Sequence, residues 1–332
     1  MTLSYVFFGT PECSVSVLDL LIASGHPPLA LVAQPDRPKG RGCLMCCPPT
    51  KDWANEHRVR VLQPDKCKDE EFLQAISALK PDLGVVFAYG KLLPRSLLAI
   101  PRLGFINIHP SLLPRYRGAA PIQWALVNGD PETGVSILQV TPRFDDGDIL
   151  LQESTAITLE ENAEQLSSRL AALGARLTLR VLEKMEGGDF CALPQNEDSV
   201  IWAPELTKED GDLDWTQTAL ALHNRIRGLY PWPGAYTHLD GKVLKIHRAR
   251  PLDTPSPHPA ARPGQVVRAD KDDLWVQTGQ GLLALLGLQL EGRKRLDARE
   301  FLLGRVVSEG HFLKQGPTQP PAPQQPRNSC SG

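Results

Sequence analysis

The 332-residue sequence has no long hydrophobic run, no strong net charge and no evident leader. No stretch approaches the ~18 uninterrupted apolar residues that a membrane-spanning helix needs. The first residues, MTLSYVFFGTPE, lack the basic or Arg- and Ser-rich character of a targeting segment. Lys and Arg number 36 against 38 Asp and Glu, giving a formal charge of −2. This balance argues against a uniformly basic nucleic-acid coat and against an acidic disordered chain.

The sequence also lacks the cysteine and glycine motifs of several protein classes. Its seven cysteines are an odd number scattered along the chain, which favours reduced thiols over a disulfide framework. A zinc site needs four well-spaced ligands, and the chain offers one C-x-x-C within Cys43, Cys46 and Cys47, with Cys67 further on. No G-x-G-x-x-G precedes the first predicted helix, where the turn reads Gly9-Thr10-Pro11. We therefore expect no metal, and neither a dinucleotide-dependent dehydrogenase nor a P-loop enzyme.

Short apolar runs alternate with helical patterns in the first part of the chain. This alternation predicts an α/β domain over residues 1–188, with a Rossmann-like, mostly parallel sheet covered by helices on both faces. Gly187-Gly188 ends its last helix. The predicted strands are 4–9, 29–34, 59–62, 82–90, 104–110 and 134–140, and the predicted helices are 15–25, 69–79, 121–129 and 162–186.

The remainder of the chain reads as a linker, a smaller β-rich domain and a tail. The pattern lapses over 189–206, which predicts a linker. One helix and five short strands over 207–315 predict a small OB-like β-barrel or a sandwich. Residues 316–332 hold five prolines and no apolar periodicity, so we expect disorder there. The helix is 216–229, and the strands are 235–239, 243–249, 264–268, 274–278 and 282–289.

Two polar residues follow each other at strand spacing near the end of the run FINIHP. Asn107 and His109 lie two apart, so both side chains leave the same face of the strand. Pro110 ends the strand, which places the pair at the carboxyl edge where open α/β sheets bind ligands. An amide donor beside an imidazole suits acyl-type chemistry, because the amide holds an oxyanion and the imidazole relays a proton. A purely structural pair is the alternative.

An acidic, glycine-containing turn follows a later predicted strand. It reads Phe144-Asp145-Asp146-Gly147-Asp148. One of its carboxylates could orient the imidazole, as the third member of a catalytic triad does. A turn that binds a divalent metal is one alternative, but such a site needs a second acidic cluster, which the sequence lacks. A solvated acidic loop is the other alternative.

Basic residues gather in two places. The loop 35–42 carries Arg37, Lys39 and Arg41 among glycine and proline, and a later turn carries Arg293, Lys294 and Arg295. Such clusters could track a phosphate backbone or hold nucleic acid on a β-barrel. Simple solvation is the alternative for each.

The order of these motifs resembles one family, the formyltetrahydrofolate-dependent formyltransferases. The resemblance rests on FINIHPSLLPRYRGAAPIQWAL (105–126), together with VVFAYGKLLP (85–94) and FDDGDILLQ (144–152). The loop QPDRPKGRG (34–42) and the later runs LTKEDGDLDWTQ (206–217), IRGLYPWPGAY (226–236) and GRKRLDAREFL (292–302) point to the branch that acts on methionyl-tRNA. The similarity covers about residues 4–310.

The resemblance implies roles for named residues. Asn107, His109 and Asp145 would be catalytic, with Asp145 rather than Asp146 or Asp148 as the third member. The folate-contacting segment would be Ser111, Leu112, Leu113 and Pro114. The loop 35–50, with Arg37, Lys39 and Arg41, would meet tRNA, and we assign Arg293, Lys294 and Arg295 to the same partner. The implied donor is 10-formyltetrahydrofolate, the implied acceptor is initiator methionyl-tRNA, and no metal is implied.

One segment departs from the family pattern. After QPDRPxGRG the family usually continues with lysines, whereas this chain reads Cys43-Leu44-Met45-Cys46-Cys47. Either Lys39 and Lys51 compensate, or affinity for tRNA is weaker. The alternatives to the methionyl-tRNA assignment are a formyltransferase acting on a sugar-nucleotide amine and a catalytically inactive tRNA-binding protein. We expect a monomer without a membrane partner in a bacterial cytoplasm.

Overall fold

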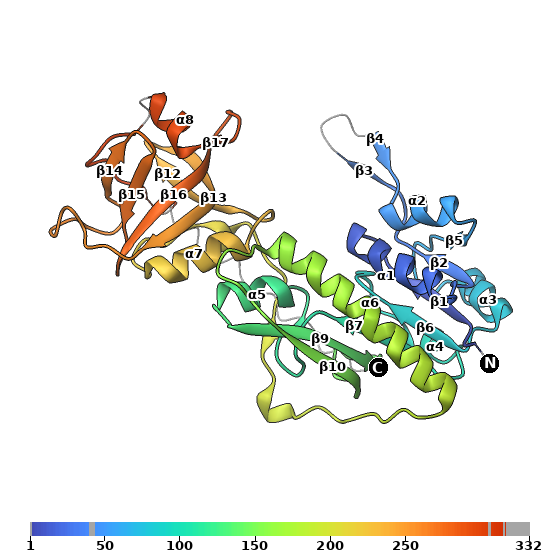
Figure 1. The fold of residues 1–332 in the computed structure, drawn as a ribbon. Coiled ribbons are helices and arrows are strands. Elements are labelled where there is room, and N and C mark those ends of the chain that lie inside the picture. Colours follow the sequence, from blue (N-terminus) through green and yellow to red (C-terminus); the bar gives the residue numbers. More distant parts are fainter. Residues whose placement is uncertain (1, 40–43, 305–306, 315, 317–332) are drawn as a thin grey trace, which may run out of the picture. The chain divides into compact units, whose positions relative to one another are not determined.

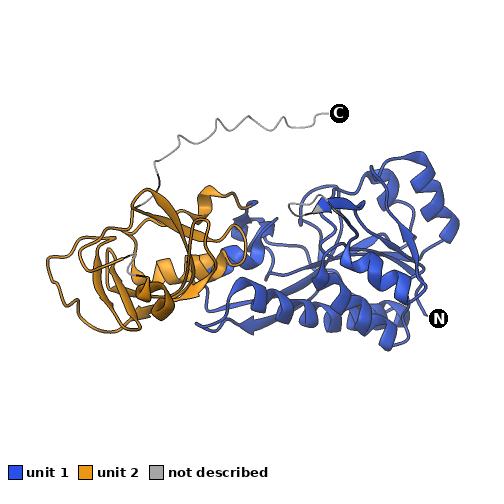
Figure 2. Ribbon diagram, turned by 90° about the horizontal axis from the view of Figure 1, so that it is seen from above, with its two compact units in different colours: residues 1–126, 130–205 blue, residues 127–129, 206–332 orange. Residues whose placement is uncertain are grey.

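The computed structural model describes residues 2–39, 44–304, 307–314 and 316 (Figure 1). The chain forms two compact units, coloured separately in Figure 2. The first holds the residues up to 126 and 130–205, and the second holds 127–129 and the residues from 206 onward. Within the described part of the chain, no helix is both long enough and apolar enough to cross a membrane.

A seven-stranded sheet organises the first unit, in the order β10-β9-β7-β6-β1-β2-β5. The five strands from β7 to β5 are parallel, whereas β9 runs antiparallel to both β7 and β10. The predicted mostly parallel α/β sheet is thereby confirmed. The strands are β1 (Tyr5–Phe8), β2 (Ala30–Val32), β5 (Arg60–Leu62), β6 (Leu83–Val86), β7 (Phe105–His109), β9 (Glu132–Gln139) and β10 (Ile149–Ala156).

Alternation along β1 explains why this sheet is apolar on both faces. Tyr5 and Phe7 enter one hydrophobic cluster, and Val6 and Phe8 enter another, because successive side chains leave opposite faces. The helices α1 (Glu12–Ala23) and α6 (Ala163–Gly187) pack on the first face, and α3 (Glu70–Leu79) packs on the second (Figure 1). A strand buried on both faces reads as a continuous apolar run, as YVFF does.

The long helix α6 begins and ends where its sequence predicts. Asn162 and Gln165 form a reciprocal capping box at its start, each side chain accepting from the other's backbone N–H. Gly188 caps its end with φ +73°, a conformation that favours glycine.

Shorter elements complete the first unit, and several were not predicted. They include the hairpin of β3 and β4 and the helix α2, whose sequence PTKDWANE is too polar to show a helical apolar stripe. Residues 189–205, predicted as a linker, lie with the first unit. The elements are β3 (Arg37–Lys39), β4 (Leu44–Cys46), α2 (Pro49–Glu56), α4 (Arg95–Leu98), β8 (Arg117–Gly118), α5 (Pro121–Val127), η1 (Glu197–Ser199) and β11 (Trp202–Ala203).

An antiparallel sheet organises the second unit, in the order β12-β13-β16-β15-β14, with β17 beside β16. Residues 312–314 connect the two edges of this sheet. Lys314 pairs with His238 on the edge strand β12, and Phe312 pairs with Gln265 just before the other edge strand, β14. This closure agrees with the predicted small barrel-like β-domain. Its elements are η2 (Glu209–Gly211), α7 (Ala219–Gly228), β12 (Ala235–Leu239), β13 (Lys242–Leu252), β14 (Val266–Asp270), β15 (Asp273–Gln277), β16 (Leu282–Leu290), β17 (Leu296–Asp297) and α8 (Ala298–Leu303).

The predicted disorder of the proline-rich tail concerns residues that, apart from Gly316, lie outside the described part of the chain. It stays a prediction.

Candidate active site

Asn107 and His109 lie on the last parallel strand of the sheet, β7, with Ile108 between them. Asn107 is half-buried and His109 is 4% exposed. In register, Asn107 sits beside Val86 of β6 and Leu138 of β9, so it lies where the parallel part of the sheet meets the antiparallel part. Both residues therefore stand on a rigid, central strand at its carboxyl end, as their spacing predicts.

Asp145 reaches the same place from the turn between β9 and β10. Its backbone has φ +49°, in the left-handed region, which Asp enters more readily than most residues. Two positions later Gly147 packs so closely on β9 that a Cβ atom there would lie 1.8 Å from the carbonyl oxygen of Gln139. Only glycine fits at that position. Its close contact with β9 fixes the turn against the sheet and therefore helps to place Asp145.

The carboxylate of Asp145 connects the three candidate catalytic residues. Asn107 Nδ2 donates to its Oδ1 at 3.3 Å, and its Oδ2 lies 3.6 Å from His109 Nδ1. The backbone N–H of Gly118 donates to the same Oδ2 at 3.0 Å. The structure thus brings together the residues that the resemblance implies, although they come from positions 38 residues apart.

The orientation of the His109 ring follows from its other nitrogen. Nε2 lies 2.8 Å from the carbonyl oxygen of Tyr116. A carbonyl only accepts, so Nε2 carries the proton and donates, which leaves Nδ1 as the nitrogen that faces Asp145. The ring can therefore exchange a proton at the site only through Nδ1.

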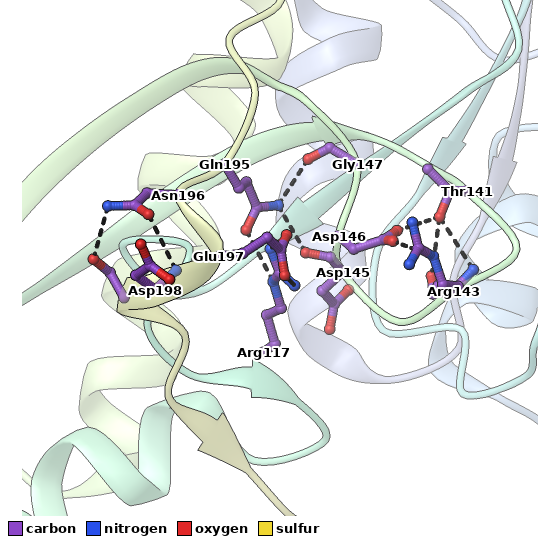
Figure 3. A network of polar contacts seen from close by, with 11 residues as sticks. Arg117, Thr141, Arg143, Asp145, Asp146, Gly147, Gln195, Asn196, Glu197 and Asp198 are labelled. Carbon is purple, nitrogen blue, oxygen red and sulfur yellow. Dashed lines mark hydrogen bonds and ion pairs between the residues drawn. The ribbon is translucent and has the colours of Figure 1, made fainter.

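The neighbouring acid Asp146 has a different set of contacts. Its carboxylate accepts a short hydrogen bond from the Thr141 hydroxyl and pairs with the Arg143 guanidinium at 2.6 Å. Figure 3 shows this pair on the far side of the turn from Gln195. Asp146 stabilises the turn from within, whereas Asp145 faces Asn107 and His109.

The segment 111–114, expected to contact folate, is folded against β9 and β10. Leu113 N–H donates to Ser136 Oγ at 3.1 Å, and Gln152 Nε2 donates to the carbonyl oxygen of Leu113 at 3.0 Å. Ser111 and Leu113 are buried, and Leu112 and Pro114 keep part of their surface exposed. A ligand could touch the side chains of Leu112 and Pro114, whereas those of Ser111 and Leu113 shape the segment. The folate contact itself stays a prediction.

A pocket that the sequence did not indicate lies in the same unit. It has a volume of about 380 Å³. Its apolar lining comes from Leu92, Leu93, Pro94 and Pro142, and its basic lining from Lys66, Lys68 and Arg95. Pro142 belongs to the loop that carries Asp145 three residues later. The pocket therefore adjoins the acidic turn and combines an apolar wall with several cations.

The basic loop is only partly described. Arg37 is exposed on β3, and the backbone of Lys39 ends the same strand. Arg41 and Cys43 lie outside the described residues. Lys51, considered as a replacement for the absent lysines, binds Asp36 through Nζ at 2.7 and 2.9 Å. Hydrogen bonds from Gln63 and Lys51 lower the pKa of Asp36, so this acid stays ionised and offsets the charge of Lys51.

Of the cysteines in this loop, the structure describes Cys46 and Cys47. Cys46 and Cys47 are exposed, and the Cys47 thiol donates to Asp52, which raises its pKa. Within residues 2–39, 44–304, 307–314 and 316, no group of three His, Cys, Asp or Glu side chains is placed to hold a metal ion.

The second basic cluster, Arg293 to Arg295, lies in the exposed turn after β16. The Arg295 guanidinium stacks over the Tyr230 ring at 5.6 Å and also lines a pocket of about 300 Å³ with Arg248. Two arginines and one acid, Asp297, line this pocket, so its net charge favours an anionic ligand. The role of the cluster in binding tRNA stays a prediction.

Sequence patterns missed a polar network that supports the acidic turn (Figure 3). Gln195 Nε2 donates to the carbonyl oxygens of Asp145 and Gly147 at 2.8 and 2.7 Å. The buried Arg117 donates from Nε to Gln195 Oε1 at 3.0 Å and binds Glu197 through its two terminal nitrogens. These contacts span 48 to 80 residues, so no spacing rule in a single sequence indicates them.

Family models match both units of the chain. The model described as "Formyl transferase" matches residues 3–182, and the model described as "Formyl transferase, C-terminal domain" matches residues 205–306. The chain is 45% identical over 311 residues to a methionyl-tRNA formyltransferase of Syntrophus aciditrophicus, covering 94% of this chain and 99% of that protein. It is 46% identical to one of Geobacter metallireducens, covering 93% and 97%.

Solved structures share the fold at low sequence identity. An N-formyltransferase from Helicobacter canadensis, in complex with folinic acid and dTDP-3-aminofucose, aligns with a TM-score of 0.65 at 14% identity, covering 85% of this chain and 98% of that chain. HypX from Aquifex aeolicus, in complex with tetrahydrofolic acid, aligns with a TM-score of 0.64 at 18% identity, covering 92% and 48%. At these identities the likeness establishes the fold alone.

Proposed function

The chain belongs to the formyl transferase family, and we propose that it transfers the formyl group of 10-formyltetrahydrofolate to the α-amino group of initiator methionyl-tRNA. The observation that carries the proposal is that Asn107 and His109 both lie beside the carboxylate of Asp145. The chain that holds these residues matches methionyl-tRNA formyltransferases over nearly its whole length. The product would be the N-formylated methionyl-tRNA used to start translation.

The reaction needs a neutral amine, a polarised formyl carbonyl and a place for one proton. The amine nitrogen attacks the formyl carbon, a C–N bond forms, and the carbonyl oxygen becomes an oxyanion. The amine then loses a proton, the bond between the formyl carbon and N10 of the folate breaks, and N10 takes up a proton. The products are the formamide and tetrahydrofolate, so atoms and charges balance without an oxidant or a metal.

Each candidate residue has a role that fits its contacts. Asn107 uses one N–H of Nδ2 on Asp145 and keeps the second for the oxyanion, a donor that is already oriented before reaction. His109 is held through Nε2 by Tyr116, so Nδ1 exchanges the proton and stabilises the charge. Asp145 Oδ2 lies 3.6 Å from Nδ1, so the carboxylate stabilises the ring once Nδ1 has taken up a proton and thereby helps to remove the amine proton.

The folate donor fits the residues beside this turn. We assign its body to the partly exposed Leu112 and Pro114 and to the apolar wall that includes Leu92 and Pro142. Lys66, Lys68 and Arg95 suit the carboxylates of its tail, because cations in a pocket bind carboxylates by charge-assisted hydrogen bonds.

For the tRNA we propose the two basic segments. Arg37, Lys39 and Arg41 would contact the acceptor arm, and Arg293, Lys294 and Arg295 would contact phosphates through the second unit. With Lys51 bound to Asp36, Lys39 is the better candidate to replace the absent lysines. We further propose that one copy of the chain suffices and that it works in a bacterial cytoplasm, since the relatives named above come from bacteria.

The test is transfer of labelled formyl from 10-formyltetrahydrofolate to initiator methionyl-tRNA. Uncharged tRNA is the control for the amine, and dTDP-3-aminofucose represents the sugar-nucleotide alternative. We expect label on methionyl-tRNA alone. Label on the amino sugar, or tRNA binding without any transfer, would contradict the proposal and would support one of the two alternatives.

A further inference from the structure

The turn that bears Asp145 has contacts of its own, through Asp146, and contacts from a distant segment, through Gln195. The φ of Asp145, +49°, lies in the left-handed region, and its carboxylate meets three donors or partners on other segments, Asn107, His109 and Gly118. A carboxylate in such a place is productive only if the backbone that carries it stays fixed, because a displacement of about 1 Å costs up to 10²-fold in rate.

The fixing contact comes from the segment after α6. The side-chain amide of Gln195 has two N–H groups and one carbonyl oxygen, and all three are used. Nε2 donates to the carbonyl oxygens of Asp145 and Gly147, which bracket Asp146 in the turn (Figure 3). Oε1 accepts from Arg117 Nε.

Arg117 determines which way the amide points. A guanidinium only donates, so the oxygen of Gln195 must face it and the NH₂ group must face the turn. Arg117 is itself 3% exposed, and Glu197 holds its two terminal nitrogens at 3.2 and 2.8 Å. These hydrogen bonds lower the pKa of Glu197, so the ion pair persists at neutral pH.

The same short strand connects this pair to the reacting groups. The residues on either side of Arg117 touch the site directly, since Tyr116 O accepts from His109 Nε2 and Gly118 N–H donates to Asp145 Oδ2. Parallel pairing of β8 with β11 holds this strand, with Arg117 N–H donating to Ile201 O at 3.0 Å. Gln195 thus links the turn that bears Asp145 to the strand that orients both Asp145 and His109.

We infer that Gln195 is a positioning residue of the formyl transfer reaction, acting through Asp145, with Arg117 and Glu197 fixing its orientation. The inference rests on the proposed function for its kinetic readout. It also gives Gln195 and Glu197 a part in the active site, in a segment where the sequence predicts only a linker.

The variant that tests the inference is Gln195→Met, which keeps the length and bulk of the side chain and removes all three hydrogen bonds. The control is Gln74→Met, the same substitution at an exposed position of α3, where the side chain donates to Glu70 and contacts neither the turn nor Arg117. We expect Gln195→Met to lower kcat by about 10- to 100-fold with KM for both substrates within about threefold. Gln74→Met should stay within about twofold of the unaltered chain in kcat.

Amide hydrogen exchange provides a readout that needs no activity. The Gly118 N–H is protected by Asp145 Oδ2, and the Arg117 N–H is protected by Ile201 O. In Gln195→Met we expect exchange at Gly118 to speed up about tenfold or more while exchange at Arg117 changes little. Equal acceleration at both amides would mean that Gln195 merely fastens the segment, and would overturn the inference.

The kinetic outcomes separate the two proposals. If the unaltered chain does not formylate methionyl-tRNA, the proposed function fails, and exchange at Gly118 still decides whether Gln195 positions Asp145. If the unaltered chain is active and Gln195→Met keeps kcat within twofold, the proposed function stands and the inference is overturned.

Discussion

The acidic turn 144–148 and the described part of the basic loop 35–50 differ in how their charged groups are held. In the turn, the Asp145 carboxylate contacts three other segments, and its backbone is fixed by Gln195. In the loop, Arg37 is exposed on a short hairpin. The carboxylate of Asp36 forms an ion pair with the ammonium group of Lys51, which follows the loop. Both regions are polar loops in sequence, and only contacts with distant residues distinguish them.

This difference fits the roles that we propose for the two regions. Proton transfer and oxyanion stabilisation depend on atoms placed to within about 0.5 Å, which requires hydrogen bonds from several directions. Binding to a phosphate backbone depends mainly on the number of cations and tolerates mobile, solvated side chains. Substitutions in the turn should therefore act on kcat, and substitutions in the loop should act on KM for tRNA.

The largest effects are expected on β7, beside the turn. Asn107→Ala removes the donor that we propose for the oxyanion and should lower kcat by about 10²- to 10³-fold. His109→Ala should lower it by about 10²- to 10⁴-fold, since it removes the proton-exchanging group. Binding of methionyl-tRNA, measured by filter retention, should change less than threefold for both. Full activity of His109→Ala would contradict the assigned mechanism.

An intermediate effect is expected from the loop. Arg41→Ala should raise KM for methionyl-tRNA by about tenfold, reduce the slope of log KM against log salt by about 1, and leave folate binding unchanged. Arg176, exposed on α6 away from the proposed contacts, provides the control Arg176→Ala. Unaltered steady-state kinetics in Arg41→Ala would show that this loop does not meet the acceptor arm.

The smallest effect concerns the acid within the loop region. Asp36→Asn removes the charge that holds Lys51, so KM for methionyl-tRNA should fall about twofold as a cation becomes available. The lowered pKa of Asp36 keeps it ionised throughout the neutral range. The difference from the unaltered chain should therefore be the same at pH 6 and at pH 8, and a difference that grows towards pH 8 would assign it to another group.

Much of the first unit could be predicted because its strands and helices have simple periodicities. The run YVFF and the strand FINIH are apolar enough to indicate a buried sheet, and Asn107 and His109 fall on one face by spacing alone. The helix α2 and the strand β10 were missed, because PTKDWANE is too polar for a helical stripe and ILLQESTA is partly exposed at the sheet edge.

The site could be predicted only in part. Spacing placed Asn107 with His109, but the choice of Asp145 over Asp146 needed a family resemblance, and the structure separates the two by their partners. Gln195 and Arg117 carried no signal, since a side chain that binds a backbone carbonyl 48 to 50 residues away leaves no pattern in one sequence. Closure of the second unit by residues 312–314 could not be predicted either, because these residues pair with positions far away in the sequence.

Single-turnover formyl transfer to saturating methionyl-tRNA by Asp145→Asn tests the assignment of the reaction to the turn most directly. At saturation, substrate binding by the proposed tRNA-binding loop no longer limits the rate, so only placement and proton transfer at the proposed site are measured. We predict a rate about 10³-fold below that of the unaltered chain, because an amide keeps the shape of the carboxylate without its charge or basicity. A rate within threefold of the unaltered chain would contradict the account.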